Sequence, residues 1–531
     1  MTTHKHPRPA WHGHSLWCHT QASFDGLAFL RLWHDWQSDA QRPTHLHVVA
    51  HTPQPLQAQA LISAAAAYPY LQTLAEQLAS QCWGLLPGIH RLRLGLNARV
   101  DDRLLLTLCV GAHEAWPEFA DLLRAHPTGP CTPPAATTNS VASNERTVTI
   151  IGAGIAGAGT ARALAERGWQ VTVLDAGAAP AAGASGLPVG VVAPHTSHDD
   201  SGVSRLSRAG LRHMEQTMQA LLVEGVDWGS TGVRERRLPG KTRRGGVPLS
   251  WLNEHAHTAN DWTHKAPPPA PDDAFWHPHG AWLRPGQLVR ALLAHPRIRW
   301  QGHALVDALR CAEAKWQVLQ GSTVLAESAR VVLTAGPGSA ALIATATQDG
   351  SAPRINPLRG QISWGLMADV PNNAYMPATA VNGNGSFVHN ISSPSGPAWY
   401  TGATYDRIHA DARLLDADHA ENLTRLQALE PDTAAALAPS FATVGTQASR
   451  VHGWAGVRCG VHDRLPMTGR VPHAPEGLYM NTAMGSRGLT LGLLCGELLA
   501  AQWHGEPLPI EARLAKFLDA TRFQHKDEQH T

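Results

Sequence analysis

Apolar residues follow two alternating patterns along most of the chain after residue 146. Short apolar runs at 148–151 and 170–174 are typical of buried strands, and the segment between them has the composition of a helix. Farther along, helical patterns recur at 204–223, 280–296 and 417–430, and strand-like runs recur at 317–325, 329–333 and 359–405. This alternation predicts an α/β fold in which a nucleotide-binding domain is interleaved with a second, sheet-rich domain.

The closing segment has the pattern of a strand, a glycine turn and a long helix. Its helical part carries apolar residues at positions that share one helix face: Leu491, Leu494, Cys495, Leu498 and Leu499. The spacing therefore predicts a buried helix directly after the turn.

The segment from Thr147 to Asp175 carries the clearest chemistry. Gly152 allows a tight turn, Gly154 lets backbone amides approach a pyrophosphate, and Gly157 lets the helix pack closely on the strand. The helix N-terminus would face the phosphates, and the closing acid would accept hydrogen bonds from a ribose. A chance Gly/Ala-rich turn is the alternative, and the unit alone does not separate NAD from FAD.

Composition limits the remaining possibilities. The 531 residues are 43% hydrophobic and 16% charged, which indicates a globular chain of about two to four domains. The formal net charge of +1 gives no global attraction to nucleic acid. Seven cysteines without a CxxC spacing and 31 histidines without an HExxH motif argue against a disulfide framework and a metal site. Because the chain also lacks a signal peptide and a long apolar run, we expect a cytoplasmic protein.

A segment rich in Pro, Thr, Ser and Ala at 126–146 has the composition of a linker. It divides the chain into a module at 1–125 and a larger module at 147–523.

Five sequence segments, the first of them within the unit from Thr147 to Asp175, carry a resemblance to a known family. They are GAGIAGAGTARALAERGWQVTVLD (152–175), PAAGASG (180–186), LRPGQLVRALL (283–293), PLRGQISW (357–364) and VRCGVHDRLPMTGRVP with GLYMNTAMGSRGLTL (457–491). They resemble the amino-acid-oxidase-like (DAO) flavoproteins and, among these, the C-terminal oxidoreductase domain of the bifunctional tRNA 5-methylaminomethyl-2-thiouridine biosynthesis (MnmC) family. The resemblance implies a Rossmann-type FAD-binding domain (147–225, 280–340 and 452–505) interleaved with a substrate domain (226–279 and 341–451).

The resemblance also implies which residues contact FAD. The flavin-edge loop would be Gly485, Ser486, Arg487 and Gly488, continued by Leu489 and Thr490, with amides that stabilise negative charge on the ring. The other expected cofactor contacts are Gly152, Gly154, Ile155, Ala156, Gly157, Asp175, Ala184, Ser185, Gly186, Val306 (at a strand position), Ala335 and Gly336. Leu187 stands where the family usually has Asn, so the resemblance implies the loss of a polar side chain beside the flavin.

The implied reaction oxidises a carboxymethylaminomethyl group on the wobble uridine of tRNA, and hydrolysis of the imine releases glyoxylate. Arg458 would bind the substrate carboxylate, Arg359 with Gln361 is a second candidate, and Tyr405 would line the pocket. Each of these residues also suits a structural role, as an arginine paired to a local acid or as a core aromatic.

For tRNA, the expected contact is a basic loop from Arg234 to Arg244. It contains Arg234, Arg236, Arg237, Lys241, Arg243 and Arg244 against one acid, Glu235. Phosphate contact is one interpretation of this loop, and a solvated surface loop is the other.

The N-terminal module resembles a truncated α/β methyltransferase, the activity that precedes the oxidoreductase in this family. Only Gly26 remains of a glycine-rich first loop, and Thr52 stands where an acid for the ribose is expected. The sequence therefore predicts no methyl transfer, and either a docking role or a passive covering role for this module.

Three functions remain open on the sequence. The first is the tRNA-modifying flavoenzyme, the second is a glycine- or sarcosine-oxidase-like enzyme for a free small amine, and the third is a weakly catalytic flavin- and tRNA-binding protein.

Overall fold

The computed structural model describes residues 9–95, 102–112, 114, 116–131, 146–237, 256–267, 274–313 and 315–524. The chain divides into two compact units. Unit 1 comprises Met1–Ala142, Glu166–Gly168 and Glu497–Lys516, and unit 2 comprises Ser143–Ala165, Trp169–Gly496 and Phe517–Thr531. Unit 1 thus includes residues from beyond the predicted N-terminal module.

Unit 1 contains a mixed sheet in the order β3-β4-β2-β1-β5. The strands are β1 (Leu16–Gln21), β2 (His45–Thr52), β3 (Gly88–Leu94), β4 (Arg103–Val110) and β5 (Gly129–Pro130), and the helices are α1 (Gly26–Ser38), α2 (Ala58–Ala65), α3 (Gln72–Ala79) and α4 (Pro117–Ala125). β1, β2 and β4 are parallel, whereas β3 and β5 run antiparallel to their neighbours. β5 falls within the segment that the sequence predicts as a linker.

Buried ion pairs join the segments of unit 1. Arg167 contacts Glu497 at 2.7 Å and Glu506 at 2.6 Å, and Arg91 contacts Glu497 at 3.3 Å. All four side chains are buried, so each charge depends on its partner for compensation.

Unit 2 is built around a six-stranded sheet in the order β14-β7-β6-β18-β25-β24. The strands are β6 (Thr147–Ile151), β7 (Gln170–Leu174), β14 (Ile298–Gln301), β18 (Val331–Leu333), β24 (Met467–Arg470) and β25 (Leu478–Thr482). All neighbours are parallel except β24, which runs antiparallel to β25. Together with the helices below, this arrangement confirms the predicted α/β class.

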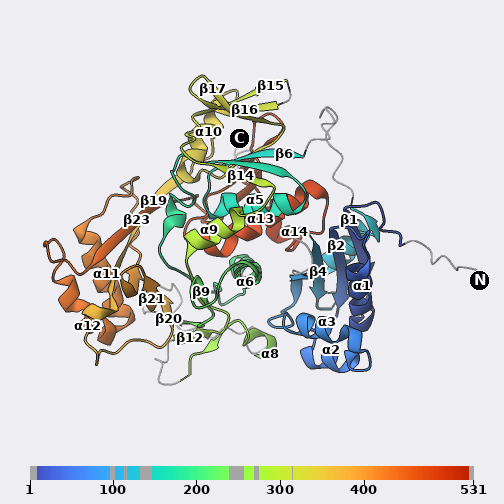
Figure 1. Ribbon diagram of the computed structural model, residues 1–531, viewed down its shortest axis with the longest axis horizontal. Coiled ribbons are helices and arrows are strands. Elements are labelled where there is room, and N and C mark those ends of the chain that lie inside the picture. The colour runs from blue at the N-terminus through green and yellow to red at the C-terminus, as the bar shows by residue number, and fades with distance from the viewer. Residues whose placement is uncertain are drawn as a thin grey trace, which may run out of the picture. The chain divides into compact units, whose positions relative to one another are not determined.

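Two glycine-containing helices lie against this sheet, α5 (Ile155–Glu166) and α13 (Gly488–His504) (Figure 1). A Cβ on Gly159 would lie 2.8 Å from Leu493 Cδ2, and a Cβ on Gly496 would lie 2.8 Å from the backbone nitrogen of Thr160. The helices therefore pack more closely than larger residues would allow.

A second, eight-stranded sheet has the order β11-β12-β10-β20-β21-β22-β19-β23. The strands are β10 (Val233–Arg236), β11 (His264–Lys265), β12 (Ala274–His277), β19 (Asn356–Leu366), β20 (Ala380–Gly383), β21 (Gly385–Ser393), β22 (Gly396–Gly402) and β23 (His452–Gly460). α11 (Asp416–Leu429) and α12 (Pro431–Phe441) pack on this sheet through Phe387, Trp399, Leu426 and Leu437.

Two sequence expectations concern this sheet. Residues 452–460, which the sequence assigns to the FAD-binding part, form β23 and pair with β19. Arg234 and Arg236, predicted to lie in a loop, belong to β10, because their backbone completes a ladder with β12 and β20. Lys241, Arg243 and Arg244 lie outside the described residues.

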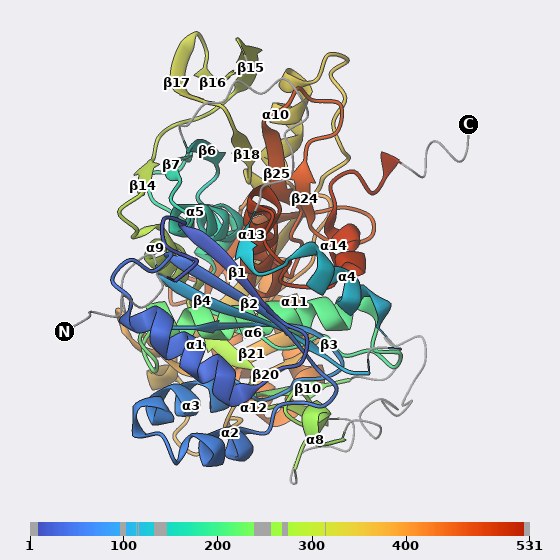
Figure 2. The same cartoon turned by 90° about the vertical axis from the view of Figure 1, so that its right-hand side faces the viewer.

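Smaller elements complete unit 2. They are the sheet of β8 (Gly190–Val192), β9 (Trp228–Gly229) and β13 (Ala281–Leu283), the sheet of β15 (Ala308–Ala312), β16 (Lys315–Gln320) and β17 (Thr323–Ser328), and helices α6 (Gly202–Leu221), α8 (Ala256–Ala259), α9 (Pro285–Leu293) and α10 (Ser339–Ala346). The strand predicted at 317–325 is thus two strands, because Gly321 takes a positive φ of 57° and turns the chain between them. β15–β17 and α12 lie at opposite ends of unit 2 in both views (Figure 2).

The parallel strands position the site. β6, β7, β18 and β25 run in one direction, so the turns that follow them meet at one edge of the sheet.

Over the described residues, there is no group of three metal-ligating side chains and no helix long and apolar enough to cross a membrane.

Candidate active site

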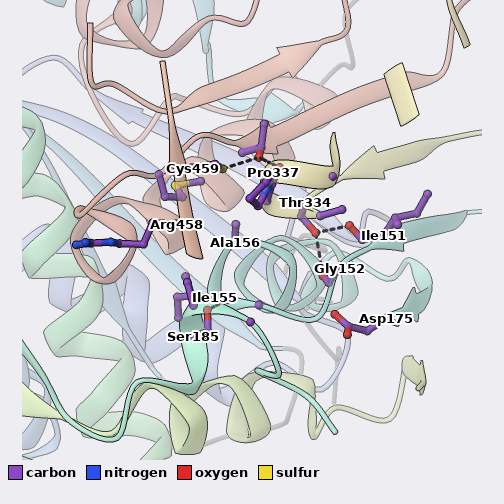
Figure 3. A pocket seen from close by; sticks show the side chains of 18 of the residues that line it. Ile151, Gly152, Ile155, Ala156, Asp175, Ser185, Thr334, Pro337, Arg458 and Cys459 are labelled. Carbon is purple, nitrogen blue, oxygen red and sulfur yellow. Dashed lines mark hydrogen bonds between the residues drawn. The ribbon is translucent and has the colours of Figure 1, made fainter. Parts of the chain in front are cut away.

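A cavity of about 700 Å³ lies where the carboxyl ends of these parallel strands meet (Figure 3). Its walls also include the short turn after Gly183, the loop before β15 and three residues of β23. A volume of this size is typical of small-molecule and cofactor sites, which span about 300–1,000 Å³.

The turn after β6 and the first turn of α5 each require a glycine. Gly152 has a φ of 110°, and a Cβ on it would lie 2.6 Å from the carbonyl oxygen of Thr334. A Cβ on Gly157 would lie 1.9 Å from the carbonyl oxygen of Gly152. The Thr334 hydroxyl donates to the carbonyl oxygens of Ile151 at 2.9 Å and Gly152 at 2.8 Å, which ties this turn to the one after β18.

Ser185 lies over the N-terminus of α5. Its Oγ accepts a hydrogen bond from the backbone N–H of Ile155 at 2.9 Å, and a Cβ on Gly154 would lie 3.2 Å from it. A hydroxyl that accepts from one amide still has a proton to donate. Ser185 and the start of α5 therefore form a site suited to a phosphate oxygen.

Asp175 follows β7 and lines the cavity. Its Oδ2 accepts from the Ala153 N–H at 2.6 Å, and its Oδ1 accepts from the Gly177 N–H at 2.7 Å. Because a carboxylate has about four acceptor positions, these two bonds fix its orientation and leave capacity for ribose hydroxyls.

Most of the sequence-predicted residues lie together at this cavity. Those that line it are Gly152, Gly154, Ile155, Ala156, Asp175, Ala184, Ser185, Val306, Ala335, Gly336, Arg458, Gly485, Ser486, Gly488 and Leu489. Those that do not line it are Gly157, Gly186, Arg359, Gln361, Tyr405, Arg487 and Thr490. Val306 lies in the loop before β15 and not in a strand.

Sequence reasoning missed part of the lining. Asn481, Thr482, Ala483 and Met484 lie at the end of β25, and Cys459 lies in β23. The signal for the first four was their place between a buried strand and the glycine turn, where parallel strands deliver residues to a site. Burial raises the pKa of the Cys459 thiol, which favours its protonated, less nucleophilic form.

Arg458 lies at the end of the cavity opposite Asp175 (Figure 3). Its Nη2 donates to the carbonyl oxygen of Thr404 at 3.2 Å, and it forms no salt bridge with a described residue. Burial lowers the pKa of its guanidinium; Tyr405 opposes this shift, and the nearby charge of Arg425 adds to it. A partly desolvated cation without an acid partner is complementary to an anionic ligand.

Arg359 has a different environment in the neighbouring strand. It is fully buried, and its guanidinium contacts Asp418 Oδ2 at 2.6 Å and Gln361 Oε1 at 2.9 Å. The Gln361 side chain also donates to the carbonyl oxygen of Leu415. Both predicted substrate residues are thus committed to the packing of α11 on β19.

The lining fits a flavin dinucleotide. The glycine turn and the N-terminus of α5 suit a pyrophosphate, Asp175 suits a ribose, and the turn before α13 presents backbone amides at the other end. Asn481, which also lines the cavity, has a buried Oδ1 without a hydrogen-bond partner among the described residues.

Comparisons with known proteins agree with this geometry. The family model for FAD dependent oxidoreductases (DAO) matches residues 147–502. The tRNA 5-methylaminomethyl-2-thiouridine biosynthesis bifunctional protein MnmC of Paracidovorax citrulli is 38% identical, covering 97% of this chain and 93% of that protein. The MnmC protein of Verminephrobacter eiseniae is also 38% identical, covering 97% of each. Glycine oxidase from Geobacillus kaustophilus has the same fold, with a TM-score of 0.51 at 20% identity over 68% of this chain and 94% of that chain. The chain therefore belongs to the DAO family of FAD dependent oxidoreductases, with FAD as its cofactor, and within it to the MnmC family.

Proposed function

We propose that this protein removes the carboxymethyl group from carboxymethylaminomethyl-uridine at the wobble position of tRNA. The names of its relatives refer to the biosynthesis of a modified tRNA uridine. The observation that carries the proposal is Arg458, a cation without a described acid partner in the wall of a flavin-type cavity. The scattered free cysteines suit a reducing compartment, and we propose that the protein acts in the cytoplasm.

Arg458 supplies the recognition step. A guanidinium binds a carboxylate through two parallel hydrogen bonds, which fixes the orientation as well as the position of the substrate. The carbon that loses hydride lies between the carboxylate and the amine, so holding the carboxylate places that carbon.

The rest of the cavity would hold the flavin. FAD supplies the acceptor for the hydride when it is bound. The backbone amides of Gly485–Gly488 and the N-terminus of α13 stabilise negative charge at that end of the cavity. Leu187 and Leu489 line the same space and exclude water from it. The resulting imine hydrolyses to glyoxylate and the free aminomethyl group.

Two other functions use the same features. Arg458 would also bind the carboxylate of free glycine or sarcosine, which makes an oxidase for a small amine the second candidate. The apolar Leu187, in a position where the family usually has Asn, favours the third candidate, a flavin- and tRNA-binding protein with little catalysis.

One assay separates the three candidates. Purified holoprotein is incubated with tRNA that carries carboxymethylaminomethyl-uridine, with glycine and with sarcosine, and glyoxylate is measured. We expect release from the tRNA at a far higher kcat/KM, together with bleaching of the flavin absorbance near roughly 450 nm. Preferential turnover of the free amines would reject the tRNA reaction, and a yellow protein that bleaches with no substrate would identify the third candidate.

We also propose that unit 1 does not transfer methyl groups. The alignment with the Paracidovorax citrulli protein spans 607 positions, whereas this chain has 531 residues, so the relative has segments without a counterpart here. The described sheet of unit 1 contains five strands, fewer than the seven of the expected methyltransferase fold. Incubation with S-adenosylmethionine and tRNA that carries the aminomethyl group should yield no methylated nucleoside, and detection of that nucleoside would reject this proposal.

A further inference from the structure

An exposed tyrosine, Tyr405, lies beside Arg458, which lines the cavity. Tyr405 is 43% exposed, and the guanidinium carbons of Arg458 and Arg407 lie 5.2 Å and 5.7 Å from its ring centroid. Arg487 follows the cavity-lining Ser486, donates from Nη1 to the carbonyl oxygen of Arg464 at 2.9 Å, and lies within electrostatic range of both Arg464 and Tyr405. We call Tyr405, Arg407, Arg458, Arg464 and Arg487 the Tyr405 surface.

The backbone under Tyr405 is firmly held. Asp406 exchanges two backbone hydrogen bonds with Arg359 of β19, each of 2.9 Å, and the Thr404 N–H donates to the carbonyl oxygen of Gln361 at 3.0 Å. Thr404 is buried, whereas Tyr405 is 43% exposed, so the Tyr405 ring lies at the surface. A ring on a fixed backbone loses little conformational freedom when it binds a ligand.

The charges of this surface are not compensated by acids. Arg407, Arg458, Arg464 and Arg487 form no salt bridge with the described residues. The nearby Asp406 is turned toward His409 at 2.6 Å and Arg359 at 3.6 Å.

The described members of the basic segment predicted for tRNA contact, Arg234, Arg236 and Arg237, have different surroundings. Arg234 pairs with Glu430 at 2.6 Å, Arg237 pairs with Glu235 at 3.3 Å, and Arg236 donates to the carbonyl oxygen of Leu429 at 2.6 Å. These three arginines contribute to packing around β10, so among the described arginines those of the Tyr405 surface have more positive charge available for phosphates.

We propose that the Tyr405 surface binds single-stranded RNA, with Tyr405 stacked on a base next to the modified uridine and the arginines at the flanking phosphates. Proteins recognise unpaired RNA loops by stacking splayed bases on aromatic rings and arginine planes. Arg458 joins the surface to the cavity, because its guanidinium borders both the cavity and the Tyr405 ring. This inference rests on the proposed function and identifies how the polymer, beyond the modified group, is recognised.

The test compares two substrates that share the reacting group. One is an anticodon stem-loop RNA with carboxymethylaminomethyl-uridine at the wobble position, and the other is the same modified uridine as a free nucleoside. The measured quantity is the ratio of kcat/KM for the stem-loop to kcat/KM for the nucleoside. We expect Tyr405→Ala to lower this ratio about 5- to 150-fold, the range for the loss of one base–aromatic stack.

Two further variants serve as controls. Tyr405→Phe retains the ring and should keep the ratio near that of the wild type. Tyr375→Ala removes another tyrosine of unit 2, 50% exposed, and should also leave the ratio unchanged. Arg407→Gln and Arg464→Gln should each reduce the slope of log kcat/KM for the stem-loop against log salt by about 0.7, the value for one contact to a single strand.

The outcomes separate this inference from the proposed function. An equal loss for both substrates in Tyr405→Ala, or no loss for either, would overturn the RNA surface. If the wild type releases glyoxylate from neither substrate, the proposed function fails, and the surface is judged by stem-loop affinity from fluorescence anisotropy. In that measurement, Tyr405→Ala should weaken binding by the same factor, and unchanged affinity would overturn the surface.

Discussion

Two arginines of unit 2 lie on adjacent paired strands, Arg359 on β19 and Arg458 on β23, and they have different roles: one is structural and the other is available to bind a ligand. In the region beneath α11, Arg359 of β19 is fully buried and paired with Asp418. At the cavity wall, Arg458 of β23 is partly exposed and forms no salt bridge with a described residue. The register pairs Leu358 with Arg458, so the two arginines project from opposite faces of the sheet. The presence of an arginine alone therefore does not define a binding site. Its guanidinium is available to a ligand only where no acidic side chain of the protein is paired with it.

The largest expected effect on stability comes from replacing the buried arginine, Arg359. Arg359→Met leaves the Asp418 carboxylate buried without its cation, and breaking such a pair costs about 3–5 kcal/mol. We expect this loss in the free energy of unfolding, measured by chemical denaturation with tryptophan fluorescence. Arg310→Met, at an exposed position, is the control and should change stability by about 0.5 kcal/mol or less. Equal losses in the two variants would contradict the structural role of Arg359.

Arg458→Met should lower the activity strongly and the stability little, the reverse of what is expected for Arg359→Met. Loss of a hydrogen bond to a charged group costs about 1.5–3 kcal/mol, which corresponds to a fall of about 10- to 150-fold in kcat/KM for glyoxylate release. Its stability should change little, because the cation it removes has no described acid partner. Arg458→Lys keeps the charge without the planar fork and should recover part of the activity. The comparison would fail if Arg458→Met unfolded as readily as Arg359→Met while its kinetics stayed at the wild-type level.

The sequence predicts a feature well when the residues that form it are close together along the chain, and poorly when they are far apart. The turn at Gly152–Gly157 is local, and its strand, helix and closing acid lie within one contiguous segment, so the pattern predicts it well. The partner of Arg359 lies 59 residues away along the chain, in a helix whose register against β19 no local pattern specifies. Tyr405 is similar, since its exposed position depends on backbone bonds to Arg359 and Gln361. The α/β class was accordingly predicted and confirmed, whereas the separation of binding from structural arginines required the three-dimensional contacts.

A smaller effect is expected from the acid of the buried pair. Asp418→Asn keeps an acceptor oxygen for the Arg359 guanidinium, and Asp406 remains 3.6 Å from it. We therefore expect a loss of about 1–2 kcal/mol in the free energy of unfolding, below that of Arg359→Met. The same denaturation experiment measures it, and kcat/KM for the holoprotein should stay within about twofold of the wild type because the pair lies outside the cavity. A loss as large as that of Arg359→Met would show that Asp406 does not contribute.

The smallest effect is expected from a substitution at Gly360, which lies next to Arg359 in the sequence and close to the Arg458 guanidinium. Gly360 follows Arg359 in β19, and a Cβ on it would lie 2.4 Å from Nη2 of Arg458 and 2.8 Å from the carbonyl oxygen of Thr404. Gly360→Ala should therefore displace the Arg458 guanidinium while leaving the Arg359–Asp418 pair intact. Overpacking of this kind costs about 1 kcal/mol at its lower end, so we expect KM for the modified tRNA to rise roughly fivefold with kcat nearly constant. Gly286→Ala in α9, where the nearest atom is 3.6 Å from the added Cβ, is the matched control and should leave KM unchanged. If Gly360→Ala lowered stability without raising KM, the close contact would belong to the packing of the sheet, and the placement of Arg458 at the substrate carboxylate would lose its support.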